Sequence, residues 1–488
     1  MSLTIEKQRE KALEPYAAVF NHIDRHENES VEAVRSFLRI PGFSDTGEGI
    51  TESANAALSY LTRISAVDAK LVDTPGHPVV TGKSYSKNPN ARTIAVYCLY
   101  DETPVDQSEW RVNPIGAEIV DAPYIGLPAE IGKVICSRAT YNHRGPMLSL
   151  ILALKAMQEV EGDIPVNILW VWEGEEEIGS PNLHVFMDQY ERELRQCEGL
   201  YQPYMQESPE GTMLIWRGKK GALLVELECK GGEWGGTVDG RHTWSGAAPF
   251  VDAPMMRLVQ AVASLYDKDQ NIAIDGVSEI VPPLNEEDRV ELRRLQEGWN
   301  DDLDRMMKAQ LSVHRWRDGK SVPELLERWV TSVGINLEGI VGGYTGPQYY
   351  SMLPQTARAK FDFRLPMGVT PDKLMALIRA HLDRRGFREI QIKNARGYEG
   401  YRSPIDTPVI QAAIRAAEAH GVPTSITPTS NSYCPVSVFA KPPFNLPSCS
   451  TGLGHGERPH QPEEYISVSA VGRYMKFAVA YLHELGKM

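Results

Sequence analysis

The sequence lacks long apolar runs and an excess of basic charge. No apolar stretch approaches the ~20 residues that a membrane-spanning helix requires, so we expect no membrane partner. Asp and Glu (64) outnumber Lys and Arg (51), which leaves a net charge of −13. Binding to nucleic acid needs clustered basic side chains, the opposite balance. Membranes and nucleic acids are therefore excluded as main partners.

Cysteine is scarce, and the N-terminal segment lacks the features of an exported protein. The six cysteines are scattered and include no CxxC pair. In a chain of this size that pattern is typical of reduced thiols. The first twenty residues are charged and amphipathic, with neither the apolar stretch nor the cleavage site of a secretory signal. We expect a cytoplasmic protein.

The length of 488 residues indicates two domains, because it exceeds what one core comfortably holds. The first ~220 residues alternate apolar, strand-like runs with helical patterns, as α/β proteins do. From Lys219 the pattern changes to segments such as "KKGALLVELECKG", where apolar and polar residues alternate as in antiparallel strands. We therefore expect one domain of residues 1–218 and 399–488, with an α+β domain of residues 219–398 inserted into it.

Two apolar strands of the first domain end in acidic segments. The first is "ARTIAVYCLYD", followed by "ETP", and the second is "DIPVNILWVWEGEEEIGS". Ligands bind beyond the carboxyl ends of parallel strands. Both acidic segments should therefore face one crevice.

The second acidic segment places Glu173 and Glu175 to Glu177 close together. These carboxylates cannot all ionise without repulsion, so a metal ion, basic neighbours or retained protons must compensate. The alternative is an ordinary solvated loop. The strongly apolar "VNILWVW" immediately before it argues against that alternative.

Two loops carry further candidate groups. "GLGHGERPHQPEEY" contains His455 and His460, and neutral imidazole is a common zinc ligand, although a loop histidine is often merely exposed. "CSRATYNHRGP" contributes Asn142, His143 and Arg144 just before a predicted helix, a place suited to anions. Capping and turn formation by Asn142 is the alternative interpretation.

In this order, the segments resemble the dinuclear zinc exopeptidase family that includes carnosinase, cytosolic non-specific dipeptidase, acetylornithine deacetylase and succinyl-diaminopimelate desuccinylase. Within it, "DGVSEIVPPLNEED", "NLEGIVGGYTGP" and "LPQTARAKFDFRLP" are most similar to the carnosinase-like branch. The resemblance covers essentially the whole chain. It implies an α/β catalytic domain with a mixed sheet between helices, and an inserted α+β lid (residues 219–398) through which two copies form a homodimer.

The metal-binding positions of the family are only partly matched. The His-x-Asp motif falls on Leu99 and Asp101, so its aspartate is present and its histidine is not. The metal-bridging aspartate falls on Asn142, and a lysine two residues later falls on Arg144. The ligand that precedes the lid is best matched by Glu207.

Other positions of the family are intact. The resemblance gives Glu176 the role of general base, and Glu177 and His460 the role of metal ligands. In a metal-free reaction, Asp101, Glu176, Glu177 and Glu207 would form a carboxylate cluster, of which at least one member should titrate high and serve as a general acid. Arg144 would stabilise negative charge beside this cluster.

The lid positions that bind substrate are matched as well. Arg364 and Asn336 fall where the family holds a substrate's carboxylate or carbonyl, often across a dimer. The lid histidine is displaced, and His242 is the nearest candidate. Cys98 and Cys434 lie beside altered positions, and the sequence assigns them no role.

The substitutions bear directly on the metal. Asn142 removes a negative charge from the bridge, and Leu99 removes an imidazole, so a standard dinuclear centre is not expected. We expect one divalent ion (zinc, manganese or cobalt) on Glu177 and His460, with Asn142, His143 or Glu207 recruited, or no ion at all. The predicted function is an amidohydrolase for a small dipeptide or N-acyl amino acid, with a reduced or altered metal site. A metal-independent or changed reaction on an amino-acid-like substrate, and a non-catalytic peptide-binding role, remain open.

Overall fold

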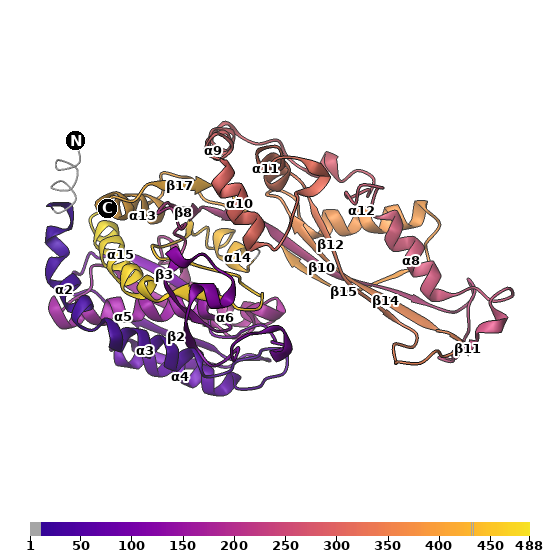
Figure 1. The fold of residues 1–488 in the computed structure, drawn as a ribbon, viewed down its shortest axis with the longest axis horizontal. Coiled ribbons are helices and arrows are strands. Elements are labelled where there is room, and N and C mark those ends of the chain that lie inside the picture. The colour runs from indigo at the N-terminus through magenta and orange to yellow at the C-terminus, as the bar shows by residue number, and fades with distance from the viewer. Residues whose placement is uncertain (1–10, 431, 433) are drawn as a thin grey trace.

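The computed structural model describes residues 11–430, 432 and 434–488, and it consists of two bodies (Figure 1). The larger body contains an eight-stranded mixed sheet in the order β1-β2-β6-β3-β7-β18-β8-β17. In that order the strands are Val67–Val72, Val79–Ser84, Asn167–Glu173, Thr93–Leu99, Leu200–Pro203, Ser448–Thr451, Met213–Trp216 and Thr424–Thr427. At its centre, β3 runs parallel to both β6 and β7.

Helices cover both faces of this sheet, which is why its central strands are apolar throughout. One apolar core joins the first face to α2 (Ala17–Arg25), α3 (Glu27–Leu38), α4 (Ile50–Arg63), α5 (Gly145–Val160), α13 (Pro408–Ala419) and α15 (Val468–Gly486). A second core joins the other face to α6 (Leu183–Gln189), α7 (Glu191–Leu194) and α14 (Val436–Ala440). The prediction of a mixed sheet between helices is confirmed.

A small four-stranded sheet brings distant parts of the chain together. Its order is β19-β20-β5-β4, formed by Gly456–Glu457, Tyr465–Ser467, Lys133–Cys136 and Glu118–Asp121. The antiparallel β20–β5 pair places the loop after β5 beside the loop before β20. Both loops carry residues that the sequence predicts to be functional.

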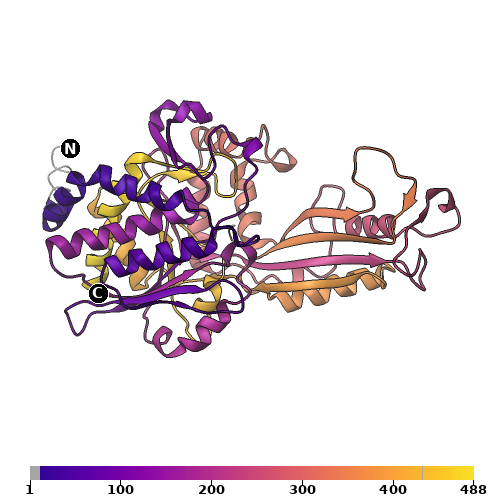
Figure 2. The same ribbon diagram turned by 90° about the horizontal axis from the view of Figure 1, so that it is seen from below.

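The lid is built on a four-stranded antiparallel sheet in the order β12-β14-β10-β15, formed by Gly334–Gly342, Thr356–Leu365, Gly221–Lys230 and Gln391–Tyr398. Alternate residues of these strands pack against α8 (Pro254–Ser264) and α12 (Pro371–Arg384) in a separate apolar core. Further helices are α9 (Glu286–Glu297), α10 (Asp301–Gln310) and α11 (Val322–Thr331). Figure 2 shows the long lid strands extending away from the larger body.

Two short strand pairs mark the two ends of the lid. At the junction of the two bodies, β9 (Gly218–Lys219) pairs with β16 (Tyr401–Arg402). At the far tip, β11 (Thr243–Trp244) pairs with β13 (Met352–Leu353), well away from the larger body in Figure 1. In the part of the chain that the structure describes, no helix is both long and apolar enough to cross a bilayer.

Candidate functional site

The two acidic segments meet where β3 and β6 end, as the sequence predicts. The backbone N–H of Tyr100 donates to the carbonyl oxygen of Glu173 at 2.8 Å, which extends the pairing beyond the strands. In the turn that follows β6, the backbone N–H of Glu177 donates to Oδ2 of Asp101 at 2.9 Å. The carboxyl ends of the central parallel strands therefore hold Asp101 and Glu177 side by side.

Asn142 lies at the centre of the candidate site. Its Nδ2 donates to Oε1 of Glu177 at 2.8 Å and lies 2.9 Å from Nε2 of His460. Nε2 of His460 is itself 3.1 Å from Oε2 of Glu177. Three of the four predicted metal-ligating residues are thus brought together from three separate loops, and Asn142 binds the other two.

A tight turn before α5 presents Asn142. The turn covers Thr140–Arg144, and a side chain on the next residue, Gly145, would place its Cβ 2.1 Å from the carbonyl oxygen of Thr140. Only glycine fits there. Glu464 holds the same turn, because its carboxylate accepts the backbone N–H groups of Tyr141 at 2.9 Å and Asn142 at 2.8 Å.

Tyr204 is a site residue that the sequence analysis missed. It is the first residue beyond β7, and its buried hydroxyl donates to Oδ1 of Asn142 at 3.1 Å. Nζ of Lys219, also buried, lies 5.0 Å from the centre of the Tyr204 ring and donates to Oε1 of Gln202 at 2.7 Å. The available signal for Tyr204 was its place directly after the strand β7. Residues that follow parallel strands lie at the same crevice as those that follow β3.

Glu207, the fourth predicted ligand, is bound elsewhere. Arg473 on α15 forms an ion pair with its carboxylate, and the backbone N–H of Gly454 donates to Oε2 at 3.0 Å. Leu99 is fully buried and offers no donor atom. Among residues 11–430, 432 and 434–488, no three His, Cys, Asp or Glu side chains are grouped as a metal site requires.

The donor set therefore does not fit a divalent ion. A protein zinc site needs at least three good ligands, and among the described residues only Glu177 and His460 of the predicted ligands place two such groups together, with their atoms 3.1 Å apart. The third neighbour of these two is the N–H side of an amide, which donates and cannot ligate.

The carboxylates of the site are held where ionisation is unfavourable. Burial, together with the nearby charge of Glu177, raises the pKa values of Asp101 and Glu176 well above their usual range. Burial also raises the pKa of Glu173 to about 7, although Tyr97 donates a hydrogen bond to it at 2.6 Å. The raised pKa values of Asp101 and Glu176 agree with the sequence-based expectation that at least one carboxyl group of the cluster titrates high.

His460 lies at the rim of the site. Its side chain is about half exposed, whereas that of Glu177 is only 4 % exposed. Partial desolvation lowers the pKa of His460, but the charge of Glu177 and the hydrogen bond to it together outweigh this, and the pKa is raised. The imidazole and the carboxylate therefore act as an ion pair at lower pH.

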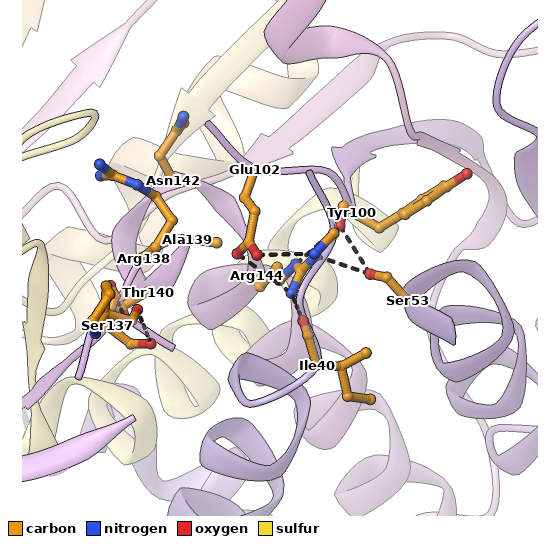
Figure 3. A network of polar contacts seen from close by, with 12 residues as sticks. Ile40, Ser53, Tyr100, Glu102, Ser137, Arg138, Ala139, Thr140, Asn142 and Arg144 are labelled. Atoms are coloured by element: carbon orange, nitrogen blue, oxygen red, sulfur yellow. Dashed lines mark hydrogen bonds and ion pairs between the residues drawn. The ribbon is translucent and has the colours of Figure 1, made fainter. Parts of the chain in front are cut away.

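Arg144, a predicted substrate-binding residue, is completely buried below the site (Figure 3). Its guanidinium donates to the carbonyl oxygens of Tyr100 and Ile40 and to Oγ of Ser53, and it lies 3.6 Å from Oε2 of Glu102. These contacts tie the end of β3 to α3 and α4. A substrate role would require this network to open.

The predicted lid residues lie at two places. On the lid sheet, Arg364 pairs with Asp362 through two hydrogen bonds of 2.8 and 3.0 Å, and Asn336 stands opposite Asp362 on the neighbouring strand. His242 is exposed at the far tip, where Nε2 lies 3.1 Å from the hydroxyl of Tyr350. Within one chain, His242 is thus remote from the carboxylate cluster (Figure 1).

A cavity of about 530 Å³ lies between the two bodies. It adjoins the turn Glu176–Ile178, because Gly179 is part of its wall. α6 and α14 supply apolar side chains from the larger body, and the lid supplies Leu224, Arg396 and Tyr398. Arg396 reaches over Gly179, since a Cβ on that glycine would be 3.5 Å from Nε of Arg396.

Comparison with curated proteins gives relatives of similar length. The chain is 22% identical over 434 residues to the Beta-Ala-His dipeptidase of Rattus norvegicus, which covers 82% of this chain and 81% of the relative. It is also 22% identical over 493 residues to the Cys-Gly metallodipeptidase DUG1 of Saccharomyces cerevisiae, covering 95% and 97%.

Solved structures share the same architecture. An M20 family metallo-carboxypeptidase, Sso-CP2 from Sulfolobus solfataricus, superposes with a TM-score of 0.80 at 26% identity, over 94% of this chain and 100% of the other. The di-peptidase Dug1p from Saccharomyces cerevisiae gives a TM-score of 0.81 at 20% identity, over 97% and 98%. Residues 114–484 match the description Peptidase family M20/M25/M40. Since this match spans most of the chain, the protein belongs to the M20 peptidase family.

Proposed function

We propose that this protein hydrolyses the amide bond of a small dipeptide or N-acyl amino acid in the crevice between its two domains. The observation that carries the proposal is the interdomain cavity, whose wall includes Gly179, the residue that follows the turn holding Glu176 and Glu177. Relatives named as Beta-Ala-His and Cys-Gly dipeptidases support a small, dipeptide-sized substrate.

The cavity and its surroundings suit such a substrate. Its lining is mostly apolar, so an aliphatic or aromatic side chain is transferred favourably from water into it. Arg396 in the cavity wall offers its guanidinium group to the free carboxylate. We propose that Arg364, which pairs with Asp362 on the lid sheet, takes part in the same binding as the sequence predicts. A guanidinium binds a carboxylate through two parallel hydrogen bonds, which fixes orientation as well as charge.

Glu176 is the acid–base group of the proposed reaction. The oxygen of an attacking water bonds to the substrate's carbonyl carbon, and the water's proton passes to the carboxylate of Glu176. The carbon–nitrogen bond then breaks, and Glu176 returns this proton to the leaving nitrogen. Asp101 supports the reaction by fixing the backbone of the turn through its hydrogen bond to Glu177.

No step of this proposal passes through a metal, because the residues present do not fit one. The sequence analysis left open one divalent ion on Glu177 and His460 or no ion at all; we propose the second, and elemental analysis tests it below. A second candidate function, binding of a peptide-like ligand without turnover, is favoured by one observation. The hydrogen bonds from Asn142 already engage Glu177 and His460.

We further propose that the lid forms a homodimer and that the partner copy delivers His242 to the crevice. The tip exposes several large apolar side chains, and exposed apolar patches mark interaction sites. These are Trp244, Phe250, Tyr344, Tyr349 and Tyr350. All six cysteines are free thiols, in keeping with the proposed cytoplasmic location.

The test is product formation from a panel of dipeptides and N-acyl amino acids, followed by liquid chromatography and mass spectrometry. Turnover should appear for substrates that combine a free carboxylate with an apolar side chain, and Glu176→Gln should abolish it. Glu52→Gln, on the exposed surface of α4, serves as the matched control. Full activity of the Glu176→Gln variant would show that another residue moves the proton. Saturable binding without product would favour the second candidate function.

A further inference from the structure

We propose that the side-chain amide of Asn142, oriented by Tyr204, takes the place of a metal ion in this site. In this arrangement the amide nitrogen, and not a metal ion, lies between Glu177 and His460. The inference concerns the site's construction and does not depend on the proposed reaction.

The first step is the orientation of the amide. An asparagine side chain has an acceptor end and a donor end, and its neighbours decide which end lies where. Glu177 is a carboxylate and accepts only, so the amide nitrogen must face it, as the 2.8 Å contact has it. On the other side, the hydroxyl of Tyr204 donates to Oδ1 at 3.1 Å. Glu177 therefore selects the orientation, and the hydroxyl of Tyr204 then satisfies Oδ1.

The second step is the geometry at Nδ2. This nitrogen donates to Oε1 of Glu177 at 2.8 Å and lies 2.9 Å from Nε2 of His460, so it stands between the two remaining candidate ligands. A metal ion that bound both atoms would have to displace the amide nitrogen. To gain a third ligand, it would also have to rotate the amide by half a turn and break the bond from Tyr204.

The third step is the rigidity of the amide. The backbone N–H of Asn142 donates to the buried carboxylate of Glu464 at 2.8 Å, and Arg138 pairs with the same carboxylate at 3.0 Å. Asn142 is 9 % exposed and Tyr204 is 6 % exposed. Rotating the amide inside this enclosure would break the hydrogen bond to Glu177 and leave buried polar groups without partners, which is unfavourable.

The fourth step is charge. The site keeps carboxylates that a dication would otherwise neutralise. Lys219 supplies a fixed cation, with its Nζ buried 5.0 Å from the ring of Tyr204. A neutral amide in place of a carboxylate at position 142 also removes one negative charge. Fewer carboxylates and a built-in ammonium reduce the need for a metal.

Metal content tests the proposal. Wild type, Glu177→Gln and Asn142→Asp are purified without chelator and dialysed against Zn²⁺, Mn²⁺ or Co²⁺, and bound metal is counted by elemental mass spectrometry. Glu177→Gln gives the background from surface histidines. We expect wild type to equal this background, and Asn142→Asp to exceed it by about one ion per chain, because aspartate restores an acceptor and a charge.

Two outcomes overturn the proposal. One is a wild type that holds about one ion per chain more than Glu177→Gln. The other is a folded Asn142→Asp variant, checked by circular dichroism, that takes up no extra ion.

If Asn142→Asp does not fold, Tyr204→Phe replaces it, since loss of the hydroxyl frees the amide to turn its oxygen inward. Zinc binding by calorimetry should then be stronger than in wild type, and equal binding contradicts the proposal. Metal counts do not depend on turnover, so failure of this proposal can be distinguished from failure of the proposed function.

Discussion

The backbone N–H of Glu177 donates to Oδ2 of Asp101 at 2.9 Å, and this bond joins the segments that follow the two central strands β3 and β6. Asp101 is completely buried, and its pKa is raised by burial and by the charge of Glu177. Its side chain accepts the hydrogen bond that fixes the turn carrying Glu176.

The first prediction concerns this acceptor. Asp101→Asn keeps an oxygen for the N–H of Glu177, so the free energy of unfolding should stay within about 1 kcal/mol of wild type. Asp101→Ala leaves the N–H without a partner and should cost about 1–3 kcal/mol. Urea denaturation measures both. Equal stability of the two variants would show that the bond does not hold the turn.

The second prediction concerns pH. The pKa of Glu173 is raised from 4.5 to about 7 in the folded chain, so the folded state binds more protons than the unfolded state between these values. Stability must then fall as pH rises from about 4.5 to about 7 and stay low above it. Glutamine at position 173 cannot ionise, so Glu173→Gln should remove this loss. The free energy of unfolding at pH 8 should rise by up to about 3 kcal/mol relative to wild type. Thermal unfolding of both proteins at pH 5 and pH 8 measures the difference. Parallel pH profiles would contradict the assignment.

The third prediction concerns Glu464, which positions Asn142. Glu464→Ala removes the acceptor of two backbone N–H groups and leaves Arg138 as a buried, unpaired cation. Breaking a buried ion pair from one side costs about 3–5 kcal/mol. Glu32→Ala breaks an exposed ion pair with Arg35 and should cost at most about 1 kcal/mol. A comparable loss in the two variants, measured by chemical denaturation, would argue against a positioning role for Glu464.

The fourth prediction concerns Arg396 and rests on the proposed function. Arg396→Ala should raise KM about tenfold for substrates with a free carboxylate and leave kcat nearly unchanged, because the contact is the same in ground and transition states. For a substrate whose carboxylate is amidated, wild type and Arg396→Ala should have the same KM. Arg388→Ala, also on the lid surface, is the control. An unchanged KM would remove Arg396 from substrate binding.

The fifth prediction concerns the lid tip. The side chain of Trp244 is 69 % exposed and that of Phe250 is 88 % exposed. Trp244→Ser combined with Phe250→Ser should convert a dimer into a monomer with the chain mass of 54.4 kDa, measured by light scattering after gel filtration. Tyr124→Ser alters an exposed aromatic residue of the larger body and should leave the mass unchanged. A wild type that is already monomeric would rule out delivery of His242 by a partner.

Much of the fold could be predicted from local patterns. The apolar segments around Val96 and Val171 indicated buried parallel strands, and the nearly uniform apolar character of residues 145–160 indicated a buried helix. Each prediction is confirmed, because burial on both faces leaves a signature in consecutive residues. The meeting of Asp101 with Glu177 followed from the parallel-strand rule in the same way.

Long-range contacts explain what could not be predicted. Tyr204 contacts Asn142 because β7 lies next to β3 in the sheet. The local sequence does not determine the order of strands in a sheet. Glu207 is engaged by Arg473, a residue 266 positions away on α15. Arg144 pairs with backbone carbonyls that no side-chain pattern reveals. Resemblance to a family identified the positions of the site, but the partners of each side chain depend on the assembled fold.

The interdomain cavity has a consequence for motion. Its walls belong to two bodies joined at the short β9–β16 pair, so its volume changes whenever the angle between them changes. Ligand binding and interdomain angle are therefore linked equilibria: a ligand that fills the cavity selects the conformers whose walls fit it, by as much as its affinities for them differ. Ligands of increasing size should then stabilise different interdomain angles. The size of the bound ligand would thus determine the shape of the whole molecule.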